Sequence, residues 1–148
     1  MAECVFKWVK DGDVMIGVNT PGKISDEDWS AFMAEFGASD YKIYMGFSLG
    51  ILEVSSAQRK QSAAAIRENG TSVIVITDEV LVRGIVTAVS WLGANVKSFP
   101  WRDVDRALQY ADLEDHKTKI LAQVDSLRDE VTALDDARRK KRREQMKM

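Results

Sequence analysis

The chain has 148 residues, 45% hydrophobic and 30% charged, a composition typical of a globular protein with one ordinary core. A single cysteine excludes an internal disulfide framework and favours a reducing compartment. No apolar run approaches the ~20 residues that a bilayer span needs, so we expect a soluble, cytoplasmic protein.

The net charge of −2 conceals a strong separation of charge along the chain. The last twelve residues hold seven Lys or Arg and one Glu, which leaves 14 basic and 22 acidic residues in the rest of the chain. An acidic body with a basic tip restricts any polyanion-binding role to that tip. The candidate polyanion-binding residues are Arg138, Arg139, Lys140, Lys141, Arg142 and Arg143.

The first third of the chain predicts a hairpin followed by a helix. Residues 4–9 and 13–18 are rich in apolar residues on either side of an Asp-Gly pair, which is a strong hairpin signal. Ser25 is a plausible N-cap for the helix that follows. That helix carries one aromatic face, formed by Trp29, Phe32, Met33 and Phe36.

The segment from residue 41 to residue 70 predicts extended chain and then a second helix. Gly46 and Gly50 indicate a bulge or a bend in the extended part. The helix begins near Ser56, which we expect to be its N-cap, and ends at Asn69-Gly70.

The stretch from Thr71 to Phe99 predicts strand, helix and strand in one right-handed crossover. Its first strand, Val73–Ile76, is a continuous run of β-branched apolar residues, which is typical of a central parallel strand covered on both faces. Asp78 and Glu79 follow it, and we interpret them as the cap and first-turn charges of the helix rather than as a catalytic acid pair.

The remaining chain, from Trp101 onward, contains no Gly or Pro and predicts a fourth helix and a long helical tail. Either one helix runs throughout, or the chain breaks near Asp112. Apolar residues recur in the tail at heptad positions, which favours a two-stranded coiled coil. These positions are Leu113, Ile120, Val124, Leu127, Val131 and Leu134.

Together these elements predict an α/β fold with a mixed sheet, an N-terminal hairpin, about four helices and a long C-terminal helix. We expect two parts: an α/β domain over residues 1–111, and a helical tail with a basic tip over residues 112–148.

Several short segments carry a resemblance to a known family: Ala57-Gln58-Arg59, Val75-Ile76-Thr77-Asp78, Val82–Gly93, Phe99 and Asp105-Arg106-Ala107-Leu108. They resemble the STAS-like domains related to bacterial anti-sigma-factor antagonists, including small bacterial STAS/CRAL-TRIO-like proteins. The resemblance covers about residues 4–111 and implies a STAS-like sheet and a non-enzymatic role. Such domains bind partner proteins, sometimes under phosphorylation control, and some bind nucleotides or lipids.

The resemblance places a phosphorylation site at the turn that enters the second helix, with Ser55 and Ser56 as candidates. The family's usual Asp before the serines is replaced here by Val54, and its Gly-Leu after them by Ala57-Gln58. A phosphate there would lie at a helix N-terminus near Arg59, which favours it. The alternative is that Ser56 only caps the helix.

Signatures of catalysis are scarce. His116, the only histidine, and Cys4 lie far apart in the sequence, so neither a nucleophilic triad nor a zinc site is indicated. No phosphate-binding glycine loop is present. We therefore predict a non-enzyme without cofactor or metal.

The third helix carries an unusual outer face. Helical periodicity turns Val82, Ile85, Val86, Val89 and Leu92 toward the sheet. Val80, Gly84, Thr87 and Trp91 share the opposite side with Ala88, where a solvated helix would carry polar residues. We expect an interface there, although Trp91 could instead fold over its own helix or pack beneath the fourth helix or the tail.

These features predict a regulatory adaptor that binds partner proteins of unknown identity and forms a homo-oligomer, with a dimer favoured. One alternative is a small-molecule or lipid-binding domain with a cavity lined by the aromatic face of the first helix. Another is a polyanion-binding protein that contacts DNA or an anionic membrane weakly through its basic tip.

Overall fold

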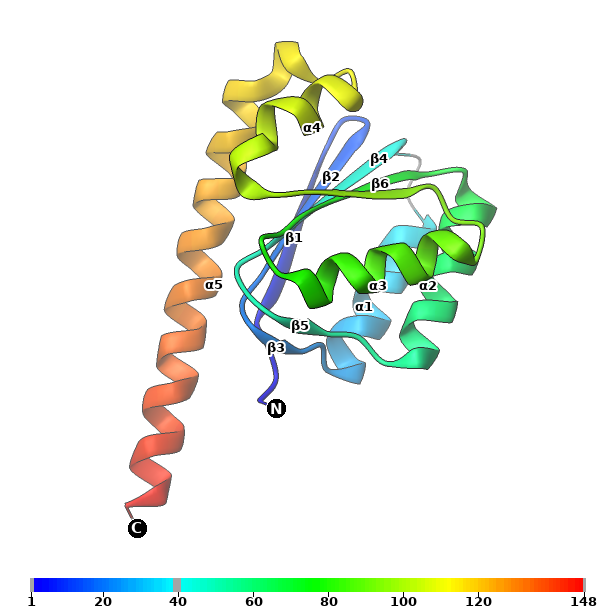
Figure 1. Cartoon of the computed structure of the whole chain (residues 1–148). Coiled ribbons are helices and arrows are strands. Elements are labelled where there is room, and N and C mark those ends of the chain that lie inside the picture. Colours follow the sequence, from blue (N-terminus) through cyan, green and yellow to red (C-terminus); the bar gives the residue numbers. More distant parts are fainter. Residues whose placement is uncertain (1, 39–40, 148) are drawn as a thin grey trace.

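A five-stranded mixed sheet forms the middle layer of the structure (Figure 1), a computed structural model that describes residues 2–38 and 41–147. The strands lie in the order β1-β2-β4-β6-β7. Their bounds are Phe6–Asp11 for β1, Val14–Asn19 for β2, Ile43–Ser48 for β4, Ser72–Ile76 for β6 and Val96–Phe99 for β7. The α/β fold class is therefore confirmed.

The predicted hairpin joins β1 and β2, which pair antiparallel, and Gly12 adopts φ 60° in its turn. All other neighbours in this sheet are parallel. β6 lies between β4 and β7, so it is an interior strand with a parallel neighbour on each side, although the central position of the sheet belongs to β4. A second, two-stranded sheet pairs β3, Gly22–Lys23, with β5, Leu52–Glu53.

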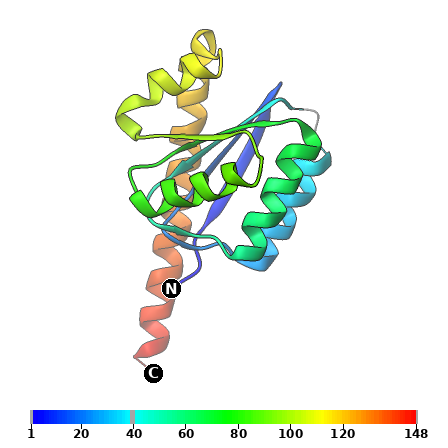
Figure 2. The ribbon, with the colours of Figure 1, turned by 45° about the vertical axis from the view of Figure 1, so that its right-hand side comes forward.

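Three helices cover one face of the five-stranded sheet (Figure 2): α1, Asp26–Ala38, α2, Ser56–Asn69, and α3, Val80–Trp91. Each connects a parallel strand to the next one along the sheet, always in the same direction. Right-handed crossovers that progress in one direction place their helices on the same face. The other face is left for the C-terminal part of the chain.

The chain breaks between the last two helices, α4, Val104–Tyr110, and α5, Lys117–Met146. Asp112 adopts φ 57° there and ends the helical path. The sequence allowed either one continuous helix or a break near Asp112, and the structure shows the break. A short 3₁₀ turn, Glu114–His116, then leads into α5.

The helix α5 runs along the sheet face opposite α1, α2 and α3, where it contacts β1 and β2 (Figures 1 and 2). Five of the six heptad residues are buried in one cluster with Val14, Ile16 and Val18 of β2. They are Leu113, Ile120, Val124, Leu127 and Val131. The sixth, Leu134, is 41% exposed.

The expectation of an intermolecular coiled coil is therefore wrong for these five residues. Their partner is the sheet of the same chain, because an apolar stripe on a long helix serves an internal core as well as a second helix. The predicted boundary after Ala111 also divides residues that share one core, so α5 is an integral layer of the α/β body.

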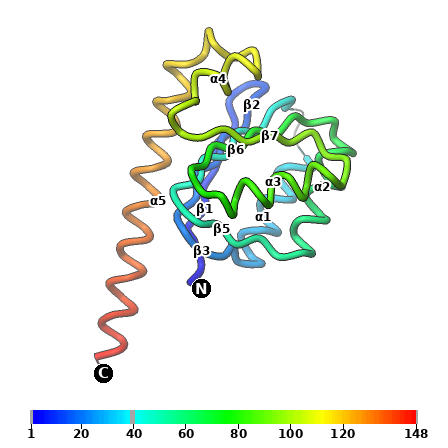
Figure 3. The backbone as a smooth tube through the Cα atoms, in the orientation of Figure 1, coloured from blue at the N-terminus to red at the C-terminus, as the bar shows by residue number. Residues whose placement is uncertain are grey.

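The last part of α5 extends past the end of the sheet (Figure 3). From Asp136 to Lys147 every residue is exposed. At the point of departure, Arg138 Nη1 donates a hydrogen bond of 3.4 Å to the Cys4 carbonyl. Asp135 is buried beside it and forms an ion pair of 3.0 Å with Arg139.

Candidate functional site

The outer face of α3 is the most exposed apolar surface on a described helix of the body. Trp91 is 83% exposed, and Val80 and Leu81, one helix length away, are 69% and 65% exposed. Gly84 and Thr87 lie between them and are exposed as well. We call the surface formed by Val80, Leu81, Gly84, Thr87, Ala88 and Trp91 the α3 stripe.

The inner face of the same helix is buried as its periodicity predicts, with Val82, Val86 and Val89 in contact with the core. Leu92 was expected there too, but it is 41% exposed. The helix ends at Trp91, so helical periodicity no longer sets the direction of the next side chain.

Trp91 makes no ring contact and no hydrogen bond through its indole with any residue that the structure describes. The indole therefore neither folds over its own helix nor packs beneath α4 or α5, which were the intramolecular alternatives. A large apolar side chain held in water on an ordered helix is typical of a contact surface.

Gly84 occupies the middle of the α3 stripe without a structural need for glycine. A Cβ built there meets no atom within 4 Å. Glycine inside a helix costs about 1 kcal/mol relative to alanine. The glycine therefore does not stabilise the fold. A helix docked against the stripe could approach the α3 backbone closely at this position, because Gly84 has no side chain.

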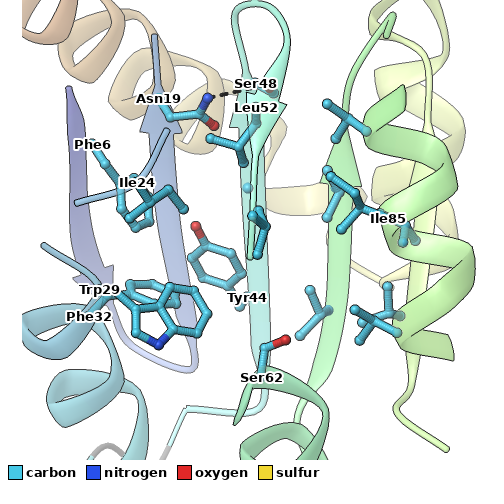
Figure 4. Close-up of a pocket in the computed structure, with 18 of the residues that line it drawn as sticks. Phe6, Asn19, Ile24, Trp29, Phe32, Tyr44, Ser48, Leu52, Ser62 and Ile85 are labelled. Carbon is cyan, nitrogen blue, oxygen red and sulfur yellow. Dashed lines mark hydrogen bonds between the residues drawn. The ribbon is translucent and has the colours of Figure 1, made fainter. Parts of the chain in front are cut away.

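A cavity of about 150 Å³ lies between the sheet and helices α1, α2 and α3 (Figure 4). Trp29, Phe32, Met33 and Phe36, which the sequence analysis singled out, all line it. Strand residues such as Val73 and Val75 form the floor, and Val82 and Ile85 of α3 form a side wall.

Tyr44 lies in this cavity over a pair of glycines. Gly17 and Gly46 are register partners on adjacent strands, and a Cβ on Gly17 would clash with the Tyr44 hydroxyl. Burial raises the pKa of Tyr44 well above its usual value, so the hydroxyl stays neutral. Tyr44 was not among the residues predicted from the sequence, although glycines in two apolar strands mark places where another group approaches the backbone closely.

The two candidate serines have separate roles at the start of α2. Ser55, not Ser56, is the N-cap: its hydroxyl accepts a hydrogen bond of 3.1 Å from the Gln58 amide. Gln58 Oε1 in turn accepts from the Ser55 amide at 3.0 Å, which completes a capping box. The predicted cap at Ser56 is wrong by one residue, because this box needs a glutamine three positions after the serine. Both serines are exposed, and Arg59 Nη1 donates to the Val54 carbonyl at 3.0 Å.

The acidic pair after β6 does not cap α3 with its side chains. Glu79 stands at the N-cap position without a side-chain cap bond. Asp78 Oδ1 instead accepts a hydrogen bond of 3.0 Å from the Trp101 amide, which ties the end of β6 to the start of the α4 region.

The remaining candidates for chemistry are separated in space or shielded. No group of three or more His, Cys, Asp and Glu side chains that could hold a metal ion occurs among residues 2–38 and 41–147. Cys4 is buried, and burial raises its pKa to about 12, so its thiol stays protonated. Within the same described residues, no helix is both long and apolar enough to cross a membrane.

No protein-family model matches the chain, and no curated protein matches it either.

Proposed function

We propose that this protein is a non-catalytic adaptor that acts through protein–protein contact at the α3 stripe, and that the first partner of this stripe is a second copy of the chain. The observation that carries the proposal is Trp91, which is 83% exposed on an ordered helix. Tryptophan is among the commonest anchors of protein interfaces.

The order of side chains along the stripe supports a second copy as the partner. Large residues stand at both ends, Val80 and Leu81 at one and Trp91 at the other, about 16 Å apart at ~1.5 Å per residue. Small residues occupy the middle. A twofold axis through the middle therefore sets the Trp91 of one copy against the Val80 and Leu81 of the other, and small residues against small ones.

The charge of the stripe also favours this contact. None of its residues is charged, so the stripe itself presents no like charges to a second copy. The stripe covers one face of a single helix of 12 residues, so the area it can bury is smaller than that of a standard stable interface. The dimer should therefore be weak and depend on concentration. The contact also brings the basic tips of two copies into one particle, which raises the avidity of any electrostatic contact there.

Sedimentation velocity over a range of concentrations tests the proposal. We expect the wild-type chain to rise from a mass of 16.6 kDa toward twice that value. Trp91→Ala should stay monomeric with an unchanged circular dichroism spectrum. The matched control is Met146→Ala, since Met146 is 86% exposed but lies on the far end of α5. A wild type that stays monomeric, or Trp91→Ala that dimerises like the control, would contradict the proposal.

Phosphorylation at the Ser55/Ser56 turn would add regulation to this role. The support is positional: both hydroxyls lie at the N-terminus of α2, where the helix dipole stabilises a phosphate. Because Ser55 holds the capping box, a phosphate on Ser56 would disturb the helix less than one on Ser55.

A further inference from the structure

We infer that the cavity between the sheet and helices α1, α2 and α3 is a binding site for a small, neutral aromatic molecule that carries one hydroxyl group, which Tyr44 recognises. This site is separate from the α3 stripe, because α3 lines the cavity with its inner face and carries the stripe on its outer face.

The lining excludes a charged ligand. No Lys, Arg, His, Asp or Glu side chain is among the described residues that line the cavity. Transfer of an ion into such surroundings is strongly unfavourable without a countercharge. The polar atoms that reach the cavity are hydroxyl and amide groups, so the ligand has to be neutral.

Of these polar groups, the Tyr44 hydroxyl is the one left without a partner. Tyr44 is only 8% exposed, and its hydroxyl makes no hydrogen bond with any described residue. The others are engaged: Asn19 Nδ2 donates to the Thr20 carbonyl and to Ser48 Oγ. Ser48 Oγ donates to the Gly50 carbonyl, and Ser62 Oγ to the Arg59 carbonyl. Tyr44 lines the cavity, so a ligand oxygen bound there would give its hydroxyl the hydrogen-bond partner that the described residues do not supply.

The size and walls of the cavity select an aromatic ring. A cavity of about 150 Å³ accommodates a molecule of roughly the size of benzene. Phe32 packs edge-on against Tyr44, with ring centroids 5.2 Å apart, and Phe6 and Trp29 complete an aromatic wall. Rings that meet such a wall gain edge-to-face contacts beyond simple burial. Figure 4 shows Tyr44 between Trp29 and Phe32 on one side and the α3 residue Ile85 on the other.

Titration of the full chain with three probes of similar shape tests the site by NMR or calorimetry. The probes are p-cresol, toluene and 4-methylbenzoate. We expect both neutral probes to bind and the charged one not to bind. Because Tyr44 pairs with the hydroxyl of p-cresol, the ratio of p-cresol to toluene affinity should fall about fivefold in Tyr44→Phe.

Two further variants locate the binding. Ile85→Phe fills the cavity from its side wall and should abolish binding of both neutral probes, with denaturant unfolding as the check that the variant folds. Trp91→Ala should leave binding unchanged, since it alters only the outer face of α3. The inference is overturned if neither neutral probe binds, if the affinity ratio is the same in Tyr44→Phe, or if Ile85→Phe binds as the wild type does.

Discussion

Tyr44 and the two glycines beneath it set the shape of the cavity at the scale of single residues. The ring lies over Gly17 and Gly46, where any larger residue would displace it. Around it, Phe6 of β1 and Phe32 and Phe36 of α1 form one aromatic cluster with the tyrosine ring. The tyrosine therefore serves as both the floor of the cavity and its unpaired polar group.

Gly17→Ala tests this geometry through stability. The new Cβ would clash with the Tyr44 hydroxyl, so we expect the free energy of unfolding to fall by about 1–3 kcal/mol. In a Tyr44→Phe background the cost should be smaller, because the clashing oxygen is gone. Urea denaturation of the four proteins of this cycle measures the coupling.

Gly37→Ala is the matched control for that cycle, because a Cβ at Gly37 meets nothing within 4 Å. It should leave stability unchanged or raise it. If Gly17→Ala lowers the free energy of unfolding equally with and without the tyrosine hydroxyl, the position of the Tyr44 ring does not depend on the glycine.

Single residues are also where the sequence was least informative. The burial of Trp29, Phe32 and Phe36 followed from their spacing, and the exposure of Trp91 followed from its position opposite the buried valines. Tyr44 could not be assigned in the same way. Its role depends on Gly17, which is the register partner of Gly46 on a neighbouring strand. The register between two strands cannot be predicted from the sequence of either strand alone.

At the scale of elements, α5 shows why a heptad pattern alone does not reveal a coiled coil. Its stripe is buried against β1 and β2, which would otherwise expose an apolar face. The strands of the five-stranded sheet and the first three helices were predictable from their local sequence patterns, whereas the short strand β3 was not. The docking of α5 was not, since it depends on which sheet face remained uncovered.

Leu127→Ala and Leu134→Ala separate the two interpretations of α5. Leu127 is 4% exposed and Leu134 is 41% exposed, although both hold the same heptad position. Leu127→Ala should cost about 2–5 kcal/mol of stability, as expected for a core leucine, and Leu134→Ala less than about 1 kcal/mol. Thermal or urea unfolding measures both. Equal, small losses accompanied by weaker self-association would instead point to an intermolecular seam.

At the scale of the whole molecule, the acidic body and the projecting basic end of α5 form two separate electrostatic regions. The exposed end carries Arg138, Arg139, Lys140, Lys141, Arg142 and Arg143. Arg138 and Arg139 are partly engaged with Cys4 and Asp135, so the four residues from Lys140 to Arg143 are those best placed to contact a polyanion.

Replacement of these four residues with glutamine tests the polyanion alternative without removing the contacts that anchor α5. If the end of α5 binds polyanions, binding of duplex DNA or anionic vesicles at low salt should be lost in this variant. Wild-type binding should also weaken steeply as salt is raised. Fluorescence anisotropy and vesicle co-sedimentation measure these effects, and unchanged binding would exclude the tip as the site. A chain that ends at Ala111 is unsuitable here, because it removes Ile120, Val124 and Leu127 from the core.

The most direct test of the adaptor proposal is the dimer dissociation constant of Gly84→Leu beside that of Gly37→Leu. Both replace a helical glycine where a Cβ meets no atom within 4 Å, so both should keep or raise the stability of the fold. We predict that Gly84→Leu, which fills the small middle of the α3 stripe, weakens the dimer at least tenfold, whereas Gly37→Leu leaves it unchanged. Equal dissociation constants for the two variants would contradict the assignment of α3 as the docking surface.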